Sequence, residues 1–443
     1  MHVHAHLDID VVAIDAAEDV TCLVQLTAPT PEQIAGRPGQ SLVVVLDRSG
    51  SMSGAPLHGS KEAIRALLRR LAPQDSFGLV VFDNTADVVI PARLMRDHDL
   101  PTVDTLIGRI AAGGSTDLSA GYLLGLREVK RSLGAAPLAG GTVLIVSDGH
   151  ANAGVVDPVQ LRDVAGQANT QHQVTTSTLG FGLGYDEVLL DAISRGGSGT
   201  HAFAPDVDAA SRELGNVVSE LLDKSVVAAL MRITPQPGLV GRVTVMQDLP
   251  HWSEGESVVI NLGDMYSAEE RKTLFSLHVP GIHTLGTATV AEVVFEFTTV
   301  PDLKEHVVTV PISVNVVPGD EARNRVPNPI VEIESLLATV DVSKRNATMS
   351  LRQGDIADAQ RAVREALDGR RAKSAEMRAN GVAPTVTERI AEATDELERL
   401  DREVHYESPD FAMKSAMMSY NESSRGRKRM SPKVDPEQDW DIE

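Results

Sequence analysis

The chain of 443 residues is long enough for about three domains and for a large buried core. Hydrophobic residues make up 42% of the sequence and charged residues 23%, which places the chain among ordinary soluble globular proteins. The formal net charge of −21 argues against a general nucleic-acid-binding protein, because phosphate contacts require a basic surface. The same acidity suits the binding of metal cations or of basic partners.

A single cysteine, Cys22, excludes an intramolecular disulfide and a cysteine-rich zinc site, and it favours a reducing compartment. The first twenty or so residues carry acids where a secretory signal needs an unbroken apolar run. The sequence has no stretch that approaches the roughly 20 apolar residues of a membrane span. We therefore expect a cytoplasmic protein without a membrane span.

In chain order, the first predicted unit is a β-hairpin within residues 1–39, with strands at 7–14 and 20–28 on either side of an acidic turn. From residue 41 onward, apolar runs of strand length alternate with segments of helical period. The expected strands are 41–47, 76–82, 88–90, 142–147, 174–179 and 200–203, and the expected helices are 56–71, 118–132, 158–167, 185–193 and 208–222. This alternation predicts a doubly wound, mostly parallel α/β domain over residues 40–223.

Beyond residue 223 the hydrophobic pattern of the sequence changes twice. Residues 224–320 contain short apolar or alternating runs separated by proline and glycine, which predicts an antiparallel β-sandwich. The N-terminal hairpin needs a larger sheet to join, so we expect it to complete this sandwich and the α/β domain to be inserted into it. Residues 328–406 have a helical pattern, and the polar residues 407–443 are expected to be a disordered tail.

Oxygen-bearing side chains cluster where the predicted buried strands end. The strand SLVVVLD closes on an acid followed by two hydroxyls at alternate positions, the strand at 142–147 closes on another acid, and a threonine precedes the helix at 118–132. Carboxyl ends of parallel strands meet at one edge of a sheet, so we expect these five side chains to converge. Such a hard, oxygen-only set suits Mg²⁺, which would also relieve repulsion between the carboxylates. The set is Asp47, Ser49, Ser51, Thr116 and Asp148.

These five residues, in this order, resemble the metal-ion-dependent adhesion site of von Willebrand factor type A domains, of the bacterial cytoplasmic type. The resemblance covers about residues 40–223, and the β-rich flanks are similar to those of inter-α-trypsin inhibitor heavy chains. It implies a Rossmann-like fold in which the two serines and the threonine hold Mg²⁺ directly or through water, while the aspartates act mostly through water. It also implies an open coordination position for an Asp or Glu of a protein partner, with Mn²⁺ or Ca²⁺ as alternative ions.

Two further functions remain open beside this non-catalytic binding role. The domain fits an adaptor subunit of a MoxR-like or chelatase-like AAA+ ATPase machine, because the sequence has no phosphate-binding Gly-x-x-x-x-Gly-Lys loop of its own. A metal-dependent hydrolase is the alternative of another class. The hydrolase function is disfavoured because the sequence has no Gly-x-Ser-x-Gly nucleophile motif, and because metal-assisted phosphatases use carboxylates as direct ligands of the metal. We therefore predict that the protein is not an enzyme.

Several other polar residues could have a structural role or a role at the metal site. His150 either lines the rim of the metal site or lies on a surface loop, and Asp117 either supports the site or caps the helix that follows. Asp83 is expected at a solvated turn, and the basic cluster at 425–429 in a solvated tail rather than on nucleic acid. Three alternating histidines could hold a transition metal on one side of a strand, although solvated strand histidines are favoured: His2, His4 and His6.

Overall fold

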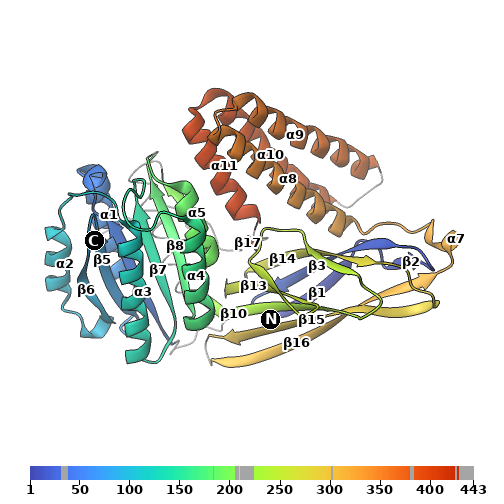
Figure 1. Cartoon of the computed structure of the whole chain (residues 1–443), viewed down its shortest axis with the longest axis horizontal. Helices are drawn as coiled ribbons and strands as arrows, with labels where there is room; N and C mark the ends of the chain where they lie inside the picture. Colours follow the sequence, from blue (N-terminus) through green and yellow to red (C-terminus); the bar gives the residue numbers. More distant parts are fainter. Residues whose placement is uncertain are drawn as a thin grey trace.

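The computed structural model describes residues 1–30, 38–182, 184–204, 209, 224–300, 303–379, 384–424 and 427–428. Figure 1 shows three parts: an α/β unit at the left, a β-sandwich at the right, and a bundle of helices above their junction. No helix in these described ranges is both long and apolar enough to cross a membrane.

The α/β unit is built on a six-stranded sheet. Its strands are β4 (Gly39–Asp47), β5 (Ser76–Phe82), β6 (Ala86–Leu94), β7 (Leu138–Ser147), β8 (Val174–Phe181) and β9 (Ser198–Ala204). The spatial order is β6-β5-β4-β7-β8-β9, with β6 as the antiparallel edge and the other strands parallel. Every residue of β4 is buried, as expected for a parallel strand that is covered on both faces.

Helices cover both faces of this sheet, which confirms the predicted doubly wound fold. They are α1 (Ala55–Leu68), α2 (Leu100–Arg109), α3 (Leu118–Ala135), α4 (Pro158–His172) and α5 (Glu187–Gly196). Apolar side chains of α1 and α2 pack on one face, and those of α3, α4 and α5 pack on the other. α2 was not predicted from the sequence. The helix has only two buried residues, Val103 and Ile107, and two positions make a weak periodic signal. The expected helix at 208–222 lies outside the described residues, apart from residue 209.

The sandwich consists of two sheets that enclose one core. The first has the order β1-β3-β14-β11, with β17 also paired to β14, and the second has the order β12-β13-β10-β15-β16-β2. The strands are β1 (His2–Leu7), β2 (Val11–Ala13), β3 (Glu18–Thr27), β10 (Lys224–Pro235), β11 (Arg242–Val245), β12 (His251–Glu254), β13 (Ser257–Tyr266), β14 (Glu270–Val279), β15 (Gly286–Thr299), β16 (Lys304–Val317) and β17 (Arg427–Lys428).

The N-terminal strands join both sheets, so the α/β unit is inserted between β3 and β10, as predicted. The predicted hairpin is wrong in detail. β3 pairs with β1, with Leu7 opposite Cys22, whereas β2 crosses to the second sheet and runs parallel to β16. The Asp8 carboxylate accepts hydrogen bonds from the Ile9 and Thr21 amides at 2.7 and 2.8 Å, and this turn directs the chain out of the first sheet.

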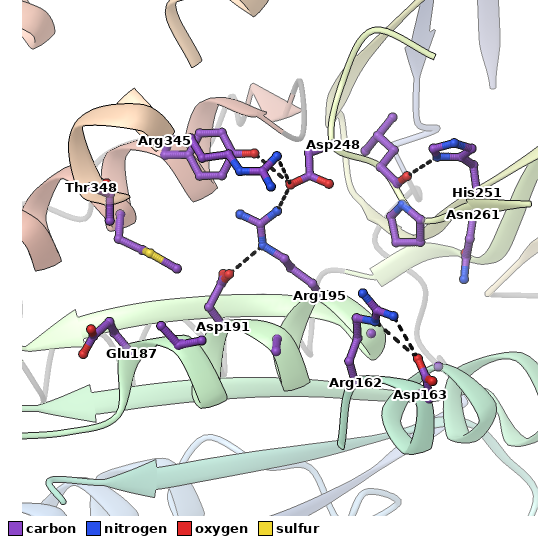
Figure 2. A pocket seen from close by; sticks show the side chains of 18 of the residues that line it. Arg162, Asp163, Glu187, Asp191, Arg195, Asp248, His251, Asn261, Arg345 and Thr348 are labelled. Carbon is purple, nitrogen blue, oxygen red and sulfur yellow. Dashed lines mark hydrogen bonds and ion pairs between the residues drawn. The ribbon is translucent and has the colours of Figure 1, made fainter. Parts of the chain in front are cut away.

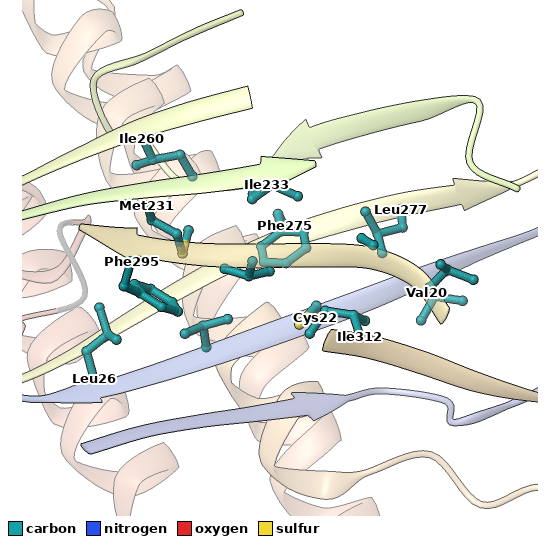
Figure 3. Close-up of a cluster of buried hydrophobic side chains, with 14 of the residues drawn as sticks. Val20, Cys22, Leu26, Met231, Ile233, Ile260, Phe275, Leu277, Phe295 and Ile312 are labelled. Carbon is teal, nitrogen blue, oxygen red and sulfur yellow. The ribbon is translucent and has the colours of Figure 1, made fainter. Parts of the chain in front are cut away.

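The core of the sandwich is shown in Figure 3. Cys22 and Phe275 from the first sheet meet Met231, Phe295 and Ile312 from the second. Burial, together with the nearby charge of Asp8, raises the pKa of the Cys22 thiol to about 12. The thiol is therefore protonated at neutral pH and acts as a small apolar group of the core.

The helical part contains four long helices: α8 (Pro329–Arg352), α9 (Ile356–Ala379), α10 (Pro384–Tyr406) and α11 (Pro409–Ser424). A short helix, α7 (Gly319–Ala322), precedes them. The expectation of a disordered tail from residue 407 is wrong for α11, which packs on α8, α10 and β9. It is also wrong for Arg427–Lys428 of the basic cluster, which form β17 and pair with β14. Ala412, Ala416 and Tyr420 recur every fourth residue and are buried, so a narrow stripe of small and aromatic side chains holds this polar helix in place.

A buried lysine–carboxylate pair lies at each junction between the three parts. In the first pair, Lys224 also donates to Thr142 Oγ1 at 3.3 Å, so that it ties the sandwich to the α/β sheet. The second pair connects the sandwich to α8, and the third connects α11 to α5. The pairs and their N···O distances are Lys224–Asp264 at 2.7 Å, Lys272–Glu334 at 2.9 Å and Lys414–Glu187 at 2.9 Å.

Candidate metal centre

The topology of the α/β sheet fixes where a ligand site is expected. The chain passes from β4 to β5 on one side of the sheet and later returns through β7 on the other side of β4. The crevice at the carboxyl ends of β4 and β7 is therefore the point where the strand order reverses, and ligands of open α/β sheets bind at such points. Asp47 is the last residue of β4, and Asp148 directly follows β7.

Hydrogen bonds connect the side chains at this point. Asp47 Oδ1 accepts from the Ser49 amide at 2.7 Å, and Asp47 Oδ2 accepts from Ser147 Oγ at 2.5 Å. The Ser49 and Ser51 hydroxyls are 3.1 Å apart, and Ser51 Oγ donates to Asp148 Oδ1 at 2.7 Å. Residues about 100 positions apart along the chain thus form one continuous polar cluster.

Thr116 joins this cluster from the loop that precedes α3. Its amide donates to Asn152 Oδ1 at 2.9 Å, which anchors the loop beside the segment that follows β7. A Cβ placed on Gly149 would lie 3.3 Å from Ser51 Oγ, 3.6 Å from Thr116 Oγ1 and 4.0 Å from Ser49 Oγ. Three hydroxyl groups therefore surround one point that a glycine leaves free. The structure brings together all five residues selected from the sequence.

The electrostatics of the cluster favour a cation. Burial raises the pKa of the Asp47 carboxyl, even though hydrogen bonds from Ser147 and Ser49 act in the opposite direction. Burial also raises the pKa of Asp148, with a further contribution from the charge of Asp47, against the hydrogen bond from Ser51. A positive charge between the hydroxyls would stabilise both ionised carboxylates.

The donor set fits a hard divalent ion. Oxygen atoms of two carboxylates and three hydroxyls are the ligand types that Mg²⁺ prefers. The described part of the chain holds no group of three or more His, Cys, Asp or Glu placed to bind a metal. The alternating histidines of β1 are thus not such a group, and a metal site at Asp47 and Asp148 depends on the hydroxyls.

Sequence reasoning missed two residues that organise the site, Ser147 and Asn152. Asp83 was expected at a solvated turn, and this is wrong. It is 8% exposed and accepts from Arg48 Nε at 3.0 Å and from the Thr85 amide at 2.9 Å. Burial acts to raise the pKa of Asp83, but these partners outweigh burial and hold it below its ordinary value. The sequence held one indication that Asp83 forms an ion pair. Arg48 lies between Asp47 and Ser49, beside the cluster, and needs a negatively charged partner.

The two neighbouring residues left open by the sequence have clear positions. Asp117 caps α3, since its carboxylate accepts from the Ala120 amide at 2.9 Å and from Ser119 Oγ at 2.7 Å. The His150 side chain is 68% exposed, and its Nδ1 lies 3.8 Å from Asp186 Oδ2 at the start of α5. It is therefore a surface residue beside the cluster.

The sequence of this part of the chain has known counterparts. Residues 41–217 match the family model of the von Willebrand factor type A domain. These residues form a von Willebrand factor type A domain. An uncharacterized protein of Synechocystis sp. is 27% identical over 259 residues, which are 56% of this chain and 60% of that protein. Inter alpha-trypsin inhibitor heavy chain 4 of Mus musculus is 28% identical over 163 residues, which are 36% of this chain and 17% of that protein.

Two solved structures are similar to the type A domain and its flanking parts together. A von Willebrand factor type A protein from Catenulispora acidiphila has a TM-score of 0.73 at 16% identity, covering 96% of this chain and 97% of that one. The ArnB paralog VWA2 from Sulfolobus acidocaldarius has a TM-score of 0.64 at 16% identity, covering 96% and 98%. At this identity the likeness concerns the fold, so the arrangement of type A domain, sandwich and helices is a shared architecture.

Proposed function

We propose that the type A domain is a Mg²⁺-dependent protein-binding module that captures an acidic side chain of a partner. The observation that carries the proposal is the convergence of three hydroxyls around one free point at the reversal of strand order, with two carboxylates hydrogen-bonded to Ser49 and Ser51. Type A domains are in general interaction modules, which supports a binding role over a catalytic one.

Each residue has a distinct task in this proposal. Ser49, Ser51 and Thr116 offer neutral oxygen ligands, and Asp47 and Asp148 orient those ligands or water through their hydrogen bonds. Neutral ligands leave much of the ion's charge uncompensated, so that the bound ion supplies an attractive position for a carboxylate from outside. Ser51 is exposed, which gives a partner access to this side of the cluster.

The surroundings of the serines support a non-catalytic role. The serine of a hydrolytic triad has a histidine as its base within hydrogen-bonding distance. Ser49 and Ser51 contact each other and Asp148, whereas His150 faces Asp186. This arrangement supports a role of the hydroxyls as ligands of an ion rather than as nucleophiles.

Isothermal titration calorimetry with Mg²⁺ tests the proposal. We expect the wild-type protein to bind one ion and Asp47→Ala to lose that binding. Because Asp47 is buried and its loss could unfold the domain, Ser51→Ala serves as a milder variant that removes a single oxygen, with Ser53→Ala as the matched exposed control. Binding that is equal in wild type, Asp47→Ala and Ser51→Ala would refute the assignment.

A further inference from the structure

A cleft of about 910 Å³ opens where the type A domain, the sandwich and the helical bundle meet. Figure 2 shows its walls, which come from α4 and α5, from the segment at 248–252, and from α8 and α11. The proposed metal chemistry does not use this cleft. Its size is in the range of pockets that enclose drug-sized ligands or several peptide side chains.

Each carboxylate of the cleft has a cationic partner, although two of them share one arginine. Arg195 lies between Asp191, at 2.7 Å, and Asp248, as Figure 2 shows. Glu187 pairs with Lys414, at 2.9 Å.

Two exposed arginines lie on α8, and one of them, Arg345, forms a long ion pair with Asp248. The Arg345 side chain is 58% exposed, and its Nη1 is 3.9 Å from Asp248 Oδ2, beyond hydrogen-bonding distance. Arg352 is also exposed and adds its charge near Glu187. Neither guanidinium donates a hydrogen bond to any residue that the structure describes. With Lys414 counted, five cationic side chains face four carboxylates at the cleft, which is an excess of one positive charge in a chain of net charge −21.

The apolar part of the lining is adaptable. Met349 is 52% exposed and Trp252 is 37% exposed, and Met413 and Met417 line the opposite side. Methionine side chains adjust to irregular surfaces and contact aromatic rings favourably. Together with the two exposed arginines, this lining fits an acidic segment that carries an aromatic side chain.

The chain itself contains a segment of this composition. Residues 435–443 read DPEQDWDIE, five acids with Trp440 and Ile442. The strand β17 pairs Arg427 with Arg271, and Arg271 lines a smaller hollow that shares Asp248 and Leu249 with the cleft. The chain therefore passes beside the cleft just before this segment. Trp440 follows Lys428 by 12 positions. Such a span can reach about 40 Å when extended.

We propose that residues 435–443 dock in this cleft of their own chain. The acidic side chains then face Arg345 and Arg352, and Trp440 packs against the methionines and Trp252. Docking covers the exposed apolar side chains of the cleft and links the three parts of the molecule through one segment.

Tryptophan fluorescence tests this proposal, because the chain has only two tryptophans, and one is in the cleft and the other in the segment. In the full-length Trp252→Phe variant, Trp440 is the only fluorophore. We expect emission at a shorter wavelength than that of free tryptophan amide and reduced quenching by acrylamide. Adding Arg345→Glu and Arg352→Glu should shift the emission to the free value and restore full quenching. Arg93→Glu, an exposed charge reversal on β6, is the matched control and should change neither.

Each other outcome overturns the proposal. Emission at the free value in Trp252→Phe itself shows that the segment is not docked. A short-wavelength emission that ignores the arginine reversals but responds to Ser51→Ala places the segment at the metal centre. A dependence on protein concentration shows docking on a second copy. If circular dichroism shows that the double reversal disturbs the fold, the single Arg352→Glu variant replaces it, with a partial shift as the expected result and no shift as the contrary one.

Discussion

Replacement of Lys414 by methionine is expected to loosen the helical bundle from the type A domain. The Lys414 ammonium donates to Glu187 Oε2 at 2.9 Å and to the Tyr185 carbonyl oxygen at 3.1 Å, and it lies 4.0 Å from the centre of the Tyr185 ring. The two charged side chains are only 2% and 8% exposed, so methionine leaves the Glu187 carboxylate buried without its cation. Breaking a buried pair in this way costs about 3–5 kcal/mol. The undocked population of α11 should therefore rise by at least about 100-fold.

The size of this effect should depend on pH in a defined direction. Burial acts to raise the pKa of Glu187, but the hydrogen bond and charge of Lys414 outweigh it and hold the pKa below the ordinary value of 4.5. The pair therefore contributes stability above pH 4.5, and this contribution is lost as the pH falls through the lower pKa of the folded state. In the variant, burial dominates and the pKa of Glu187 rises. The carboxyl then becomes neutral in mild acid, and the penalty of the substitution should shrink there.

Hydrogen exchange of the α11 amides, corrected for their intrinsic rates, measures this loosening. Arg361→Met is the control, because the Arg361–Asp358 pair on α9 is exposed and should contribute under about 0.5 kcal/mol. The double variant Glu187→Gln/Lys414→Met should recover most of the protection, since it leaves no buried charge unpaired. If Lys414→Met is as mild as Arg361→Met, the reasoning about the buried pair is wrong.

Three further outcomes follow from the structure. Gly149→Ala should lower the affinity for Mg²⁺ at least about tenfold, because the Cβ of the alanine takes the space between the hydroxyls. Circular dichroism should show an intact fold, and an unchanged affinity in calorimetry would contradict the prediction. Asp117→Ala should lower stability by about 1 kcal/mol through loss of the α3 cap, yet leave Mg²⁺ binding unchanged in the same titration. Phe275→Ala should lower the stability of the sandwich by about 3–5 kcal/mol in chemical denaturation, because it removes a buried ring from the core. The control Thr309→Ala, at an exposed position, should cost under about 0.5 kcal/mol, and similar effects of the two variants would refute the assigned core.

The sequence predicted those parts of the fold whose local pattern and burial agree. The run at 41–47 is apolar throughout because β4 is covered on both faces, and it therefore identified the central strand and the acid at its end. Elements held by few contacts gave little signal. α11 has a largely polar sequence with a narrow buried stripe, and β2 contributes three residues that pair with β16, which lies some 300 positions later. Long-range pairing of this kind leaves no local periodicity.

The candidate site was likewise predicted only in part from the sequence. The five oxygen-bearing residues were found because each follows a recognisable strand or precedes a helix. Ser147 and Asn152 were not assigned, and Asp83 was expected at a solvated turn. The roles of these three residues come from contacts that form only in the folded chain: Ser147 with Asp47, Asn152 with the Thr116 amide, and Asp83 with Arg48. Supporting groups of this kind have no fixed spacing from the residues they orient.

The central claim is that five side chains, distant in the sequence, surround one divalent ion at the carboxyl ends of β4 and β7. A crystal structure of the protein grown with Mn²⁺, with anomalous diffraction recorded to locate the metal, tests it most directly. The account predicts one strong peak between the hydroxyls of Ser49, Ser51 and Thr116, with a water or a carboxylate from another molecule in the outward position. An anomalous map with no peak there at millimolar Mn²⁺, or a peak whose ligands are other residues, would contradict it.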